Sequence, residues 1–203
     1  MQTPEVNRSS TPHGRRRRDS LVAAAARLLV ELGPEGVTAR AVASGAGTSL
    51  GQVPYHFADV GAMVRAASMR VLEDHLETAR GRLVGTTART GRQALARTLV
   101  AMVLGPYAGR GAAGVAALYS RVLAASADPR WAADMRGWDE QLDLLVAELL
   151  VAAGRDPSRA RALLACADGL AVSAALRVAS DPGAVMAAEL AGVLDLLAPR
   201  LPS

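Results

Sequence analysis

The sequence predicts an all-α protein, and three features lead to that prediction. Apolar residues recur at the spacing of amphipathic helices, and no segment alternates with the two-residue period of a half-buried strand. Sheet-forming residues are sparse, with aromatic side chains at only 3% of 203 residues. Asp-Pro pairs precede long apolar runs, which is typical of helix starts because aspartate caps exposed amides and proline fits the first helical position.

The N-terminal end is predicted to hold an unstructured arm followed by a helix. Residues 1–14 are mostly polar and contain two prolines, so we expect a disordered arm there. Leu21, Ala25 and Leu28 then repeat at helical spacing. The helix that they predict ends where Gly33-Pro34 interrupts the pattern.

Two short helices joined by a glycine turn are predicted next. Thr38 is a suitable N-cap for a helix over residues 39–45, and residues 46–49 form a turn in which glycine accepts a positive φ. A very short third helix covers residues 49–55, and Asp59 caps a longer fourth helix. With the preceding helix as support, this is the helix-turn-helix pattern.

The remainder of the chain is predicted to form longer helices. Asp128-Pro129, Asp156-Pro157 and Asp181-Pro182 each mark a helix start, and the last two helices are expected over residues 158–179 and 183–199. Between the first two pairs, apolar residues follow a 4-3 spacing that is typical of a seam against a neighbouring helix. These residues are Trp131, Met135, Trp138, Leu142, Leu145 and Leu149.

The placement of positive charge is more informative than its amount. All 23 basic residues are arginine, and the formal net charge is only +4, which does not by itself establish nucleic-acid binding. Four of them, Arg15, Arg16, Arg17 and Arg18, form a block beside the first helix. By default such a block is a solvated basic tail; beside a DNA-binding module it could instead lie along phosphates or enter the minor groove.

Metal, redox and catalytic chemistry are disfavoured. Cys166 is the only cysteine, so neither an intramolecular disulfide nor a thiolate cluster can form. His13, His56 and His75 do not pair with carboxylates at ligand spacing, and we expect no metal and no cofactor. We interpret His75 and the two acidic residues before it as a solvated helix face. The sequence has no nucleophile elbow, phosphate loop or zinc-binding helix, so we expect no enzyme.

The chain is expected to be cytoplasmic and to have no membrane partner. No stretch reaches the roughly 18 uninterrupted apolar residues that crossing a bilayer requires. The N-terminal residues are polar and lack the apolar core of a signal peptide.

The helix-turn-helix segment resembles that of the tetracycline-repressor (TetR) family of transcriptional regulators. The matching stretch is VTARAVASGAGTSLGQVPYHF from Val37 to Phe57, with the lead-in AAAARLLVELGPEG from Ala23 to Gly36. The resemblance covers roughly residues 18–70 and implies a DNA-binding domain over residues 15–60 and a regulatory and dimerisation domain over residues 61–203. It implies a homodimer, formed through the last two helices, that represses by binding a palindromic operator and is released by a small-molecule effector.

The candidate DNA contacts lie around the third helix. Gln52 can pair bidentately with adenine, Leu50 can meet a thymine methyl, and Gly51 lets the backbone approach closely. The resemblance adds Arg40 as a guanine or phosphate contact and Tyr55 and His56 as phosphate contacts. Further phosphate contacts are expected near helix N-termini, which favour anions, at Thr38, Thr48 and Ser49.

The segment departs from the family pattern at two positions. Pro54 predicts a short or distorted third helix, and Val60 stands where the family frequently has a lysine.

The resemblance also implies an effector pocket among the helices between residues 91 and 180. Because few polar groups occur there, we expect an apolar or amphipathic effector. The candidate lining residues are Met102, Tyr107, Tyr119, Trp138 and Cys166, and ordinary core packing is the competing interpretation for each. Alanine-rich stripes on the last two helices also have two interpretations, a dimer interface or an intrachain core. On the first of these two helices, the stripe consists of Ala167, Ala171, Ala174 and Ala175.

Two other classes of function remain open from the sequence. One is an enzyme of unknown helical fold, and the other is a helical adaptor that binds protein through the seam from Trp131 to Leu149. Specific DNA binding that weakens steeply with salt would separate a regulator from both.

Overall fold

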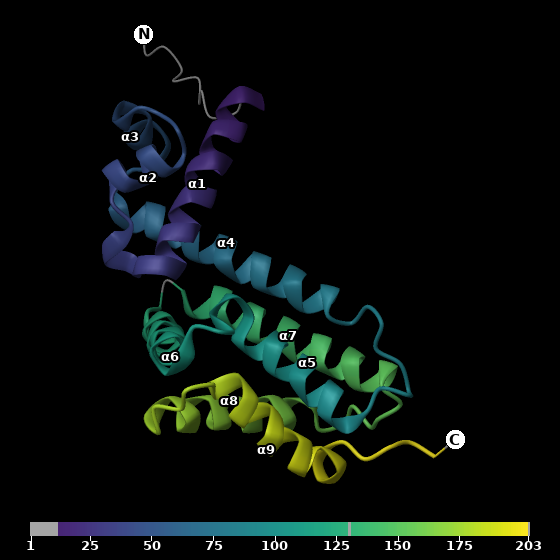
Figure 1. The fold of residues 1–203 in the computed structure, drawn as a ribbon. Helices are drawn as coiled ribbons and strands as arrows, with labels where there is room; N and C mark the ends of the chain where they lie inside the picture. The colour runs from purple at the N-terminus through teal and green to yellow at the C-terminus, as the bar shows by residue number, and fades with distance from the viewer. Residues whose placement is uncertain (1–11, 130, 203) are drawn as a thin grey trace. The chain divides into compact units, whose positions relative to one another are not determined.

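The computed structural model describes residues 12–129 and 131–202. Within these ranges the chain forms α-helices and short 3-10 helices and no β-strand, so the all-α prediction is confirmed (Figure 1). The α-helices are α1 (Pro12–Leu32), α2 (Ala39–Gly45), α3 (Val53–His56), α4 (Val60–Gly81), α5 (Arg92–Leu104), α6 (Gly111–Ala127), α7 (Ala132–Ala152), α8 (Ala160–Leu176) and α9 (Pro182–Leu197). The 3-10 helices are η2 (Pro34–Gly36), η3 (Leu50–Gln52) and η4 (Gly105–Tyr107).

The chain divides into two compact units, Met1–Glu73 and Asp74–Ser203. The division falls within α4, whereas the sequence analysis placed it after residue 60. The reason is that Met63 and Ala67, on the first turns of α4, are buried in the hydrophobic cluster of the N-terminal unit.

The N-terminal unit is built on α1, which packs against α2 (Figure 1). Part of the expected disordered arm, residues 1–11, lies outside the described residues. For residues 12–14 the expectation was wrong, since α1 already begins at Pro12. Proline suits the first turn of a helix because the amide that it lacks would have no intrahelical partner there.

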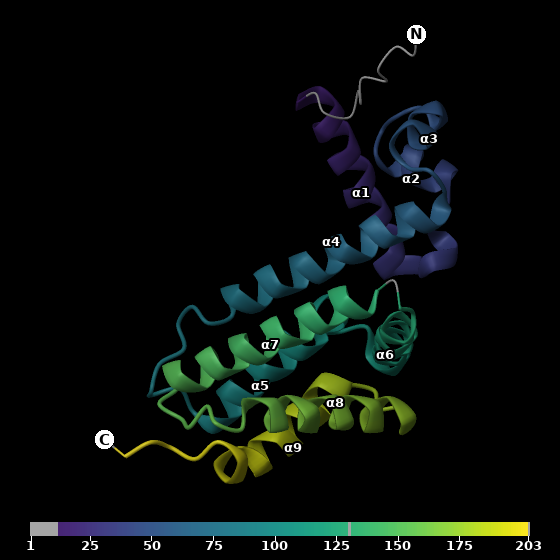
Figure 2. The same cartoon turned by 180° about the vertical axis from the view of Figure 1, so that it is seen from behind.

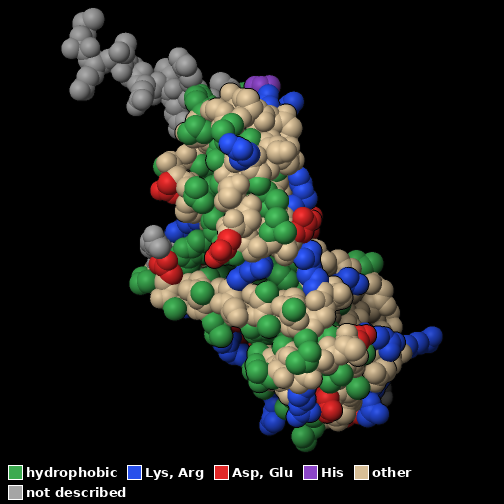
Figure 3. All heavy atoms as spheres, turned by 60° about the vertical axis from the view of Figure 1, so that its left-hand side comes forward, with side chains coloured by type: hydrophobic (Ala, Val, Ile, Leu, Met, Phe, Trp, Pro, Cys, Tyr) green, Lys and Arg blue, Asp and Glu red, His purple; other side chains and the backbone are tan. Residues whose placement is uncertain are grey.

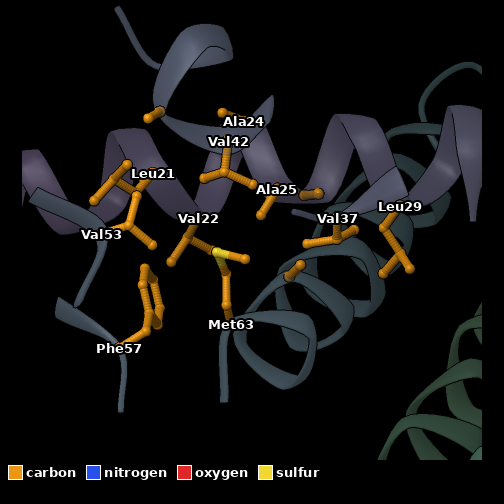
Figure 4. Close-up of a cluster of buried hydrophobic side chains, with 13 residues drawn as sticks. Leu21, Val22, Ala24, Ala25, Leu29, Val37, Val42, Val53, Phe57 and Met63 are labelled. Atoms are coloured by element: carbon orange, nitrogen blue, oxygen red, sulfur yellow. The ribbon is translucent and has the colours of Figure 1, made fainter. Parts of the chain in front are cut away.

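A small hydrophobic core ties this unit together (Figure 4). Leu21 and Val22 of α1 face Val42 of α2 from one side, and Val53 and Phe57 close the cluster from the segment around α3. All five side chains are less than 9% exposed. Since burial of each such side chain is worth about 1.5–3 kcal/mol, these contacts hold the short helices in place.

Local signals determine the turns of this unit as predicted. Thr38 caps α2, its Oγ1 accepting the amide of Ala41 at 3.2 Å, and α2 covers the predicted residues. Gly47 adopts a φ of 62°, the left-handed conformation that glycine reaches most easily. Asp59 Oδ1 accepts the amide of Ala62 at 2.7 Å and so caps α4.

In the C-terminal unit, the last helices form the centre of the packing. α5 packs along α9, and α8 contacts α9, α6 and α7 (Figures 1 and 2). The predicted seam of α7 is confirmed for four of its residues, which are less than 9% exposed: Met135, Leu142, Leu145 and Leu149. Trp131 and Trp138 are only partly buried.

The Asp181-Pro182 pair is a helix cap in the predicted sense. Asp181 Oδ1 accepts the amide of Ala184 at 2.9 Å, and Pro182 opens α9. The carboxylate of Asp156 instead closes a local turn by accepting from Ser158, so α8 begins at Ala160, two residues later than expected. α7 begins at Ala132, after a turn in which the carbonyl of Asp128 accepts the amide of Trp131.

Among the described residues, no single helix combines the length and apolar character needed to cross a bilayer. Two consecutive helical segments, Arg92–Tyr107 and Gly111–Ala127, reach that length and composition only together, across a bend of 75°.

Candidate nucleic-acid interface

The third helix of the helix-turn-helix is short and broken, as Pro54 predicts. Residues 50–52 form the 3-10 turn η3, and α3 then covers only residues 53–56. Val53 donates its amide to the carbonyl of Leu50, but Pro54 has no amide to continue an α-helical ladder from η3. We refer to residues 49–56 as the recognition segment.

One side of the recognition segment is anchored and the other faces outward. Val53 and the following Phe57 are each 5% exposed and belong to the hydrophobic cluster of the unit. By contrast, Leu50 is 50% exposed and Tyr55 49%, and Ser49, Gly51 and Gln52 are exposed as well. The candidate base-reading side chains therefore lie together on the outer side of a segment whose inner side is packed.

Two further candidates lie beside this surface, at the start of α2. Arg40 is exposed, and so is Thr38, whose hydroxyl oxygen already caps α2. On the face shown in Figure 3, basic side chains and a histidine lie at the end of the N-terminal unit, and its acidic side chains lie further from that end. This distribution suits a polyanion.

The four arginines of the block have different surroundings. Arg15 and Arg16 are exposed on the first turns of α1. Arg17 is partly buried and donates from Nη1 to Thr48 Oγ1 at 3.0 Å. The guanidinium carbon of Arg18 lies 5.4 Å from the centre of the Phe57 ring, within the range of a cation–π contact.

His56 closes the recognition segment as a partly buried side chain. Its ring meets that of Tyr55 edge-on with centroids 5.0 Å apart, and its Nδ1 is buried without a hydrogen-bond partner among the described residues. Burial, and then the positive charges of Arg18 and Arg17, lower the pKa of His56. The ring is therefore neutral at pH 7 in the absence of a bound anion.

The candidate pocket residues of the C-terminal unit fall into separate contacts. Met102 and Tyr107 are buried, while Tyr119, Trp138 and Cys166 are partly buried. Tyr107 accepts a hydrogen bond from Arg121 Nη1 at 2.8 Å. Tyr119 donates to Asp168 Oδ1 at 2.7 Å, linking α6 to α8.

Met102 and Trp138 are brought together through His75, which the sequence analysis wrongly interpreted as a solvated residue. His75 is only 4% exposed; its Nε2 donates to the carbonyl of Met102, and its ring lies 5.5 Å from that of Trp138. Burial lowers the pKa of His75, and the hydrogen bond to Met102 opposes part of that shift. Gly105 makes room for this ring, since a Cβ there would lie 2.7 Å from it.

Asp168 is a second polar residue of this unit whose contact was not predicted from the sequence. Burial raises its pKa, the hydrogen bond from Tyr119 lowers it, and Asp139 and Asp143 raise it further. Burial and the adjacent carboxylate in turn raise the pKa of Tyr119. The interruption of an otherwise apolar run by Asp168 was visible in the sequence, but its partner, 49 residues away, was not. In the part of the chain that the structure describes, no three potential metal-ligating side chains cluster.

A comparison with models of known families finds a match in the C-terminal part of the chain. A family model described as the tetracyclin repressor-like C-terminal domain matches residues 90–196, more than half of the chain. No curated protein sequence matches the chain.

Several solved structures are similar over nearly the whole chain. The multidrug binding protein EbrR, complexed with imidazole, shares 30% identity at a TM-score of 0.59, over 92% of this chain and 97% of its own. A member of the TetR family from Streptomyces coelicolor A3, SCO1917, shares 28% identity at a TM-score of 0.58, over 87% of this chain and 97% of its own. A transcriptional regulator from Rhodococcus sp. Rha1 shares 26% identity at a TM-score of 0.58, over 91% of this chain and 99% of its own.

Proposed function

This chain belongs to the TetR family of transcriptional regulators, and on that premise we propose that it is a repressor of the cytoplasm. In this proposal a homodimer binds a palindromic operator, and a small apolar or amphipathic effector releases it. We assign it no catalytic role and no cofactor.

The observation that carries the proposal is the outward presentation of the recognition segment. A major groove accepts a single helix, and base edges there are read by side chains near its N-terminal end. Leu50, Gly51 and Gln52 occupy that end and are exposed, while Val53 and Phe57 hold the segment from behind. Gln52 reads adenine through its amide, and Leu50 contacts a thymine methyl.

Phosphate contacts surround this reading surface in the proposal. Arg40 contacts guanine or a nearby phosphate from α2, while Thr38 and Ser49 lie at helix starts, where free amides favour anions. Tyr55 and His56 add polar groups along the same edge, and Arg15 and Arg16 reach phosphates from α1. Because His56 is neutral without DNA, its contact with phosphate is a hydrogen bond rather than an ion pair.

Exposed apolar side chains on α8 and α9 support dimerisation through these helices. Three alanines of the predicted stripe, Ala167, Ala171 and Ala174, are at most 2% exposed and belong to the intrachain core. On other faces, Leu176 is 79% exposed and Leu196 76%. Val172 and Val185, at 39% and 41%, are exposed on the same two helices, and in the proposed dimer the second copy covers such side chains.

The effector site is proposed among the helices of the C-terminal unit, near Met102, Tyr107, Tyr119, Trp138 and Cys166. EbrR has been crystallised with imidazole, proflavin and malachite green, and such partners suit a site in which apolar walls carry a polar group such as Asp168. An effector that binds the DNA-free form more tightly shifts the population toward it and so releases the operator.

Selection from a pool of random DNA duplexes tests the proposal. We expect the purified protein to enrich an inverted repeat whose half-sites are about 34 Å, one helical turn, apart or a multiple of it. Affinity for the selected duplex should fall steeply as salt rises, because bound arginines release counterions from phosphates. Proflavin and malachite green serve as effector probes, and a matching ligand should weaken binding. Failure to enrich any duplex would overturn the proposal in favour of an adaptor or an enzyme.

A further inference from the structure

We propose that Arg17 is a positioning residue for operator recognition: it fixes the start of the recognition segment through Thr48 and does not itself contact DNA. The inference rests on the proposed function and deepens it, because it names a residue that holds the DNA-reading surface without belonging to it.

The contact joins two points that are far apart in the sequence. Arg17 lies on α1, and Thr48 lies directly before the recognition segment, 31 residues later. Arg17 Nη1 donates to Thr48 Oγ1 at 3.0 Å in a partly buried position. The amide of Thr48 also donates to the carbonyl of Ala43 at 2.9 Å. Thr48 is therefore held from α1 by its side chain and from α2 by its backbone.

The next arginine reaches the other end of the same segment. Arg18 lies over the ring of Phe57, and Phe57 is buried in the hydrophobic cluster. Consecutive residues of α1 thus contact the residue before the recognition segment and the residue after it. Arg17 and Arg18 of the arginine block therefore each make a contact inside the protein.

The recognition segment needs such external support because it has little stability of its own. It consists of a three-residue 3-10 turn and a four-residue helix, with Pro54 between residues that could otherwise form one ladder. A helix of this length is far below the size that is stable alone. Its direction is therefore determined by the contacts at its two ends and by Val53 between them.

Arg17 binding directly to a phosphate is the alternative, and salt dependence distinguishes the two. Each phosphate that a protein neutralises contributes about one to the slope of log affinity against log salt. A residue that contacts DNA lowers this slope when its charge is removed. A residue that only positions the recognition segment lowers affinity and leaves the slope in place.

A double-mutant cycle on the selected operator tests the inference. Arg17→Met removes the donor and keeps the aliphatic stem, and Thr48→Val removes the hydroxyl and keeps the shape. We expect each to lower affinity about tenfold, and the double variant to lose no more than either single one, because both remove the same contact. Thr48→Ser, which keeps the hydroxyl, should retain wild-type affinity.

Arg16→Met is the matched control, since Arg16 is the exposed neighbour in the block. Its salt slope should fall by about one, while that of Arg17→Met stays at the wild-type value. Additive losses in the cycle, or a reduced slope for Arg17→Met, would overturn the inference and leave the proposed function standing. A wild-type protein that binds no duplex would overturn both.

Discussion

The two units of this protein differ in how much of their internal structure is determined by local signals. In the N-terminal unit, residues close in sequence set the helix ends: Thr38 caps α2, Gly47 makes the turn, and Pro54 divides the recognition segment. In the C-terminal unit, the contacts of the candidate residues are long-range, such as His75 with Met102 and Tyr119 with Asp168, 27 and 49 residues apart, as is the Arg17–Thr48 hydrogen bond of the N-terminal unit. The difference teaches which features a sequence reveals: local signals can be read from a single chain, but long-range polar pairs cannot.

Replacement of Arg155 should have the largest effect of a long-range polar contact, because Arg155 is the most buried charged residue among those described. It is 1% exposed, donates to the carbonyl of Ala198 at 2.6 Å and pairs with Asp195 at 2.8 Å, so it fastens the end of α9 to the loop that follows α7. Arg155→Ala should lower the free energy of unfolding of the C-terminal unit by about 3 kcal/mol. Both tryptophans belong to this unit, so tryptophan fluorescence during urea unfolding measures the loss.

Arg161→Ala is the control for this prediction. Arg161 contacts the carboxylates of Asp139 and Asp143 but is 71% exposed, and exposed ion pairs contribute little to stability because solvent screens them. Equal losses for the two arginine variants would contradict the prediction, because they would mean that the burial of Arg155 does not matter.

Gly105 is the next test, because it combines a special backbone conformation with a tertiary contact. It has a φ of 49°, and a Cβ would lie 2.7 Å from the buried His75 ring. Gly105→Ala should destabilise the C-terminal unit by about 2 kcal/mol, from backbone strain and overpacking together. Gly109 has a φ of 82° and open space around its Cβ position, so Gly109→Ala measures the strain alone. Thermal unfolding that gives Gly109→Ala the larger loss would contradict this assignment.

His75 gives the smallest of the three effects, a dependence of stability on pH. Its pKa is lowered in the folded protein, so the unfolded chain binds the proton more readily. Stability is therefore complete above the unfolded pKa of about 6.5 and falls as the pH drops below it, by at most about 1.4 kcal/mol per pH unit. His75→Gln does not titrate there and should flatten the dependence between pH 7.5 and 5.5. An unchanged pH profile in this variant would show that His75 is not the responsible group.

The sequence was sufficient for much of the N-terminal unit. The end of α1, the bounds of α2, and the cap of α4 were all predicted, because caps, glycines and prolines act within a few residues. The sequence analysis missed the helical start at Pro12, since a polar stretch with two prolines resembles a disordered arm.

The C-terminal unit could be predicted in class but not in detail. α5 and α6 received no predicted bounds, and α8 starts later than its Asp-Pro pair suggested. His75 was misinterpreted because its acidic neighbours, Glu73 and Asp74, indicated a solvated face. Only the packed structure shows that the next position turns inward, toward Met102 and Trp138.

In the candidate DNA site, too, local features could be predicted from the sequence and long-range contacts could not. Exposure of Gln52 follows from its place after the glycine turn, and the structure places it there. The division of the arginine block could not be predicted, because Arg17 meets Thr48 only after α1 and α2 have packed. Identical neighbours in the sequence therefore have different surroundings in the folded unit.

Gln52→Ala provides the most direct test of the central claim, that the recognition segment reads DNA. The affinity of the Gln52→Ala protein should be measured on the selected operator and on every single base-pair variant of that operator. Gln93→Ala, at an exposed position of the C-terminal unit, is the control. We predict lost discrimination at one position of each half-site, by about 1–3 kcal/mol, and unchanged discrimination elsewhere. A Gln52→Ala protein that keeps both wild-type affinity and wild-type base preference would contradict the account.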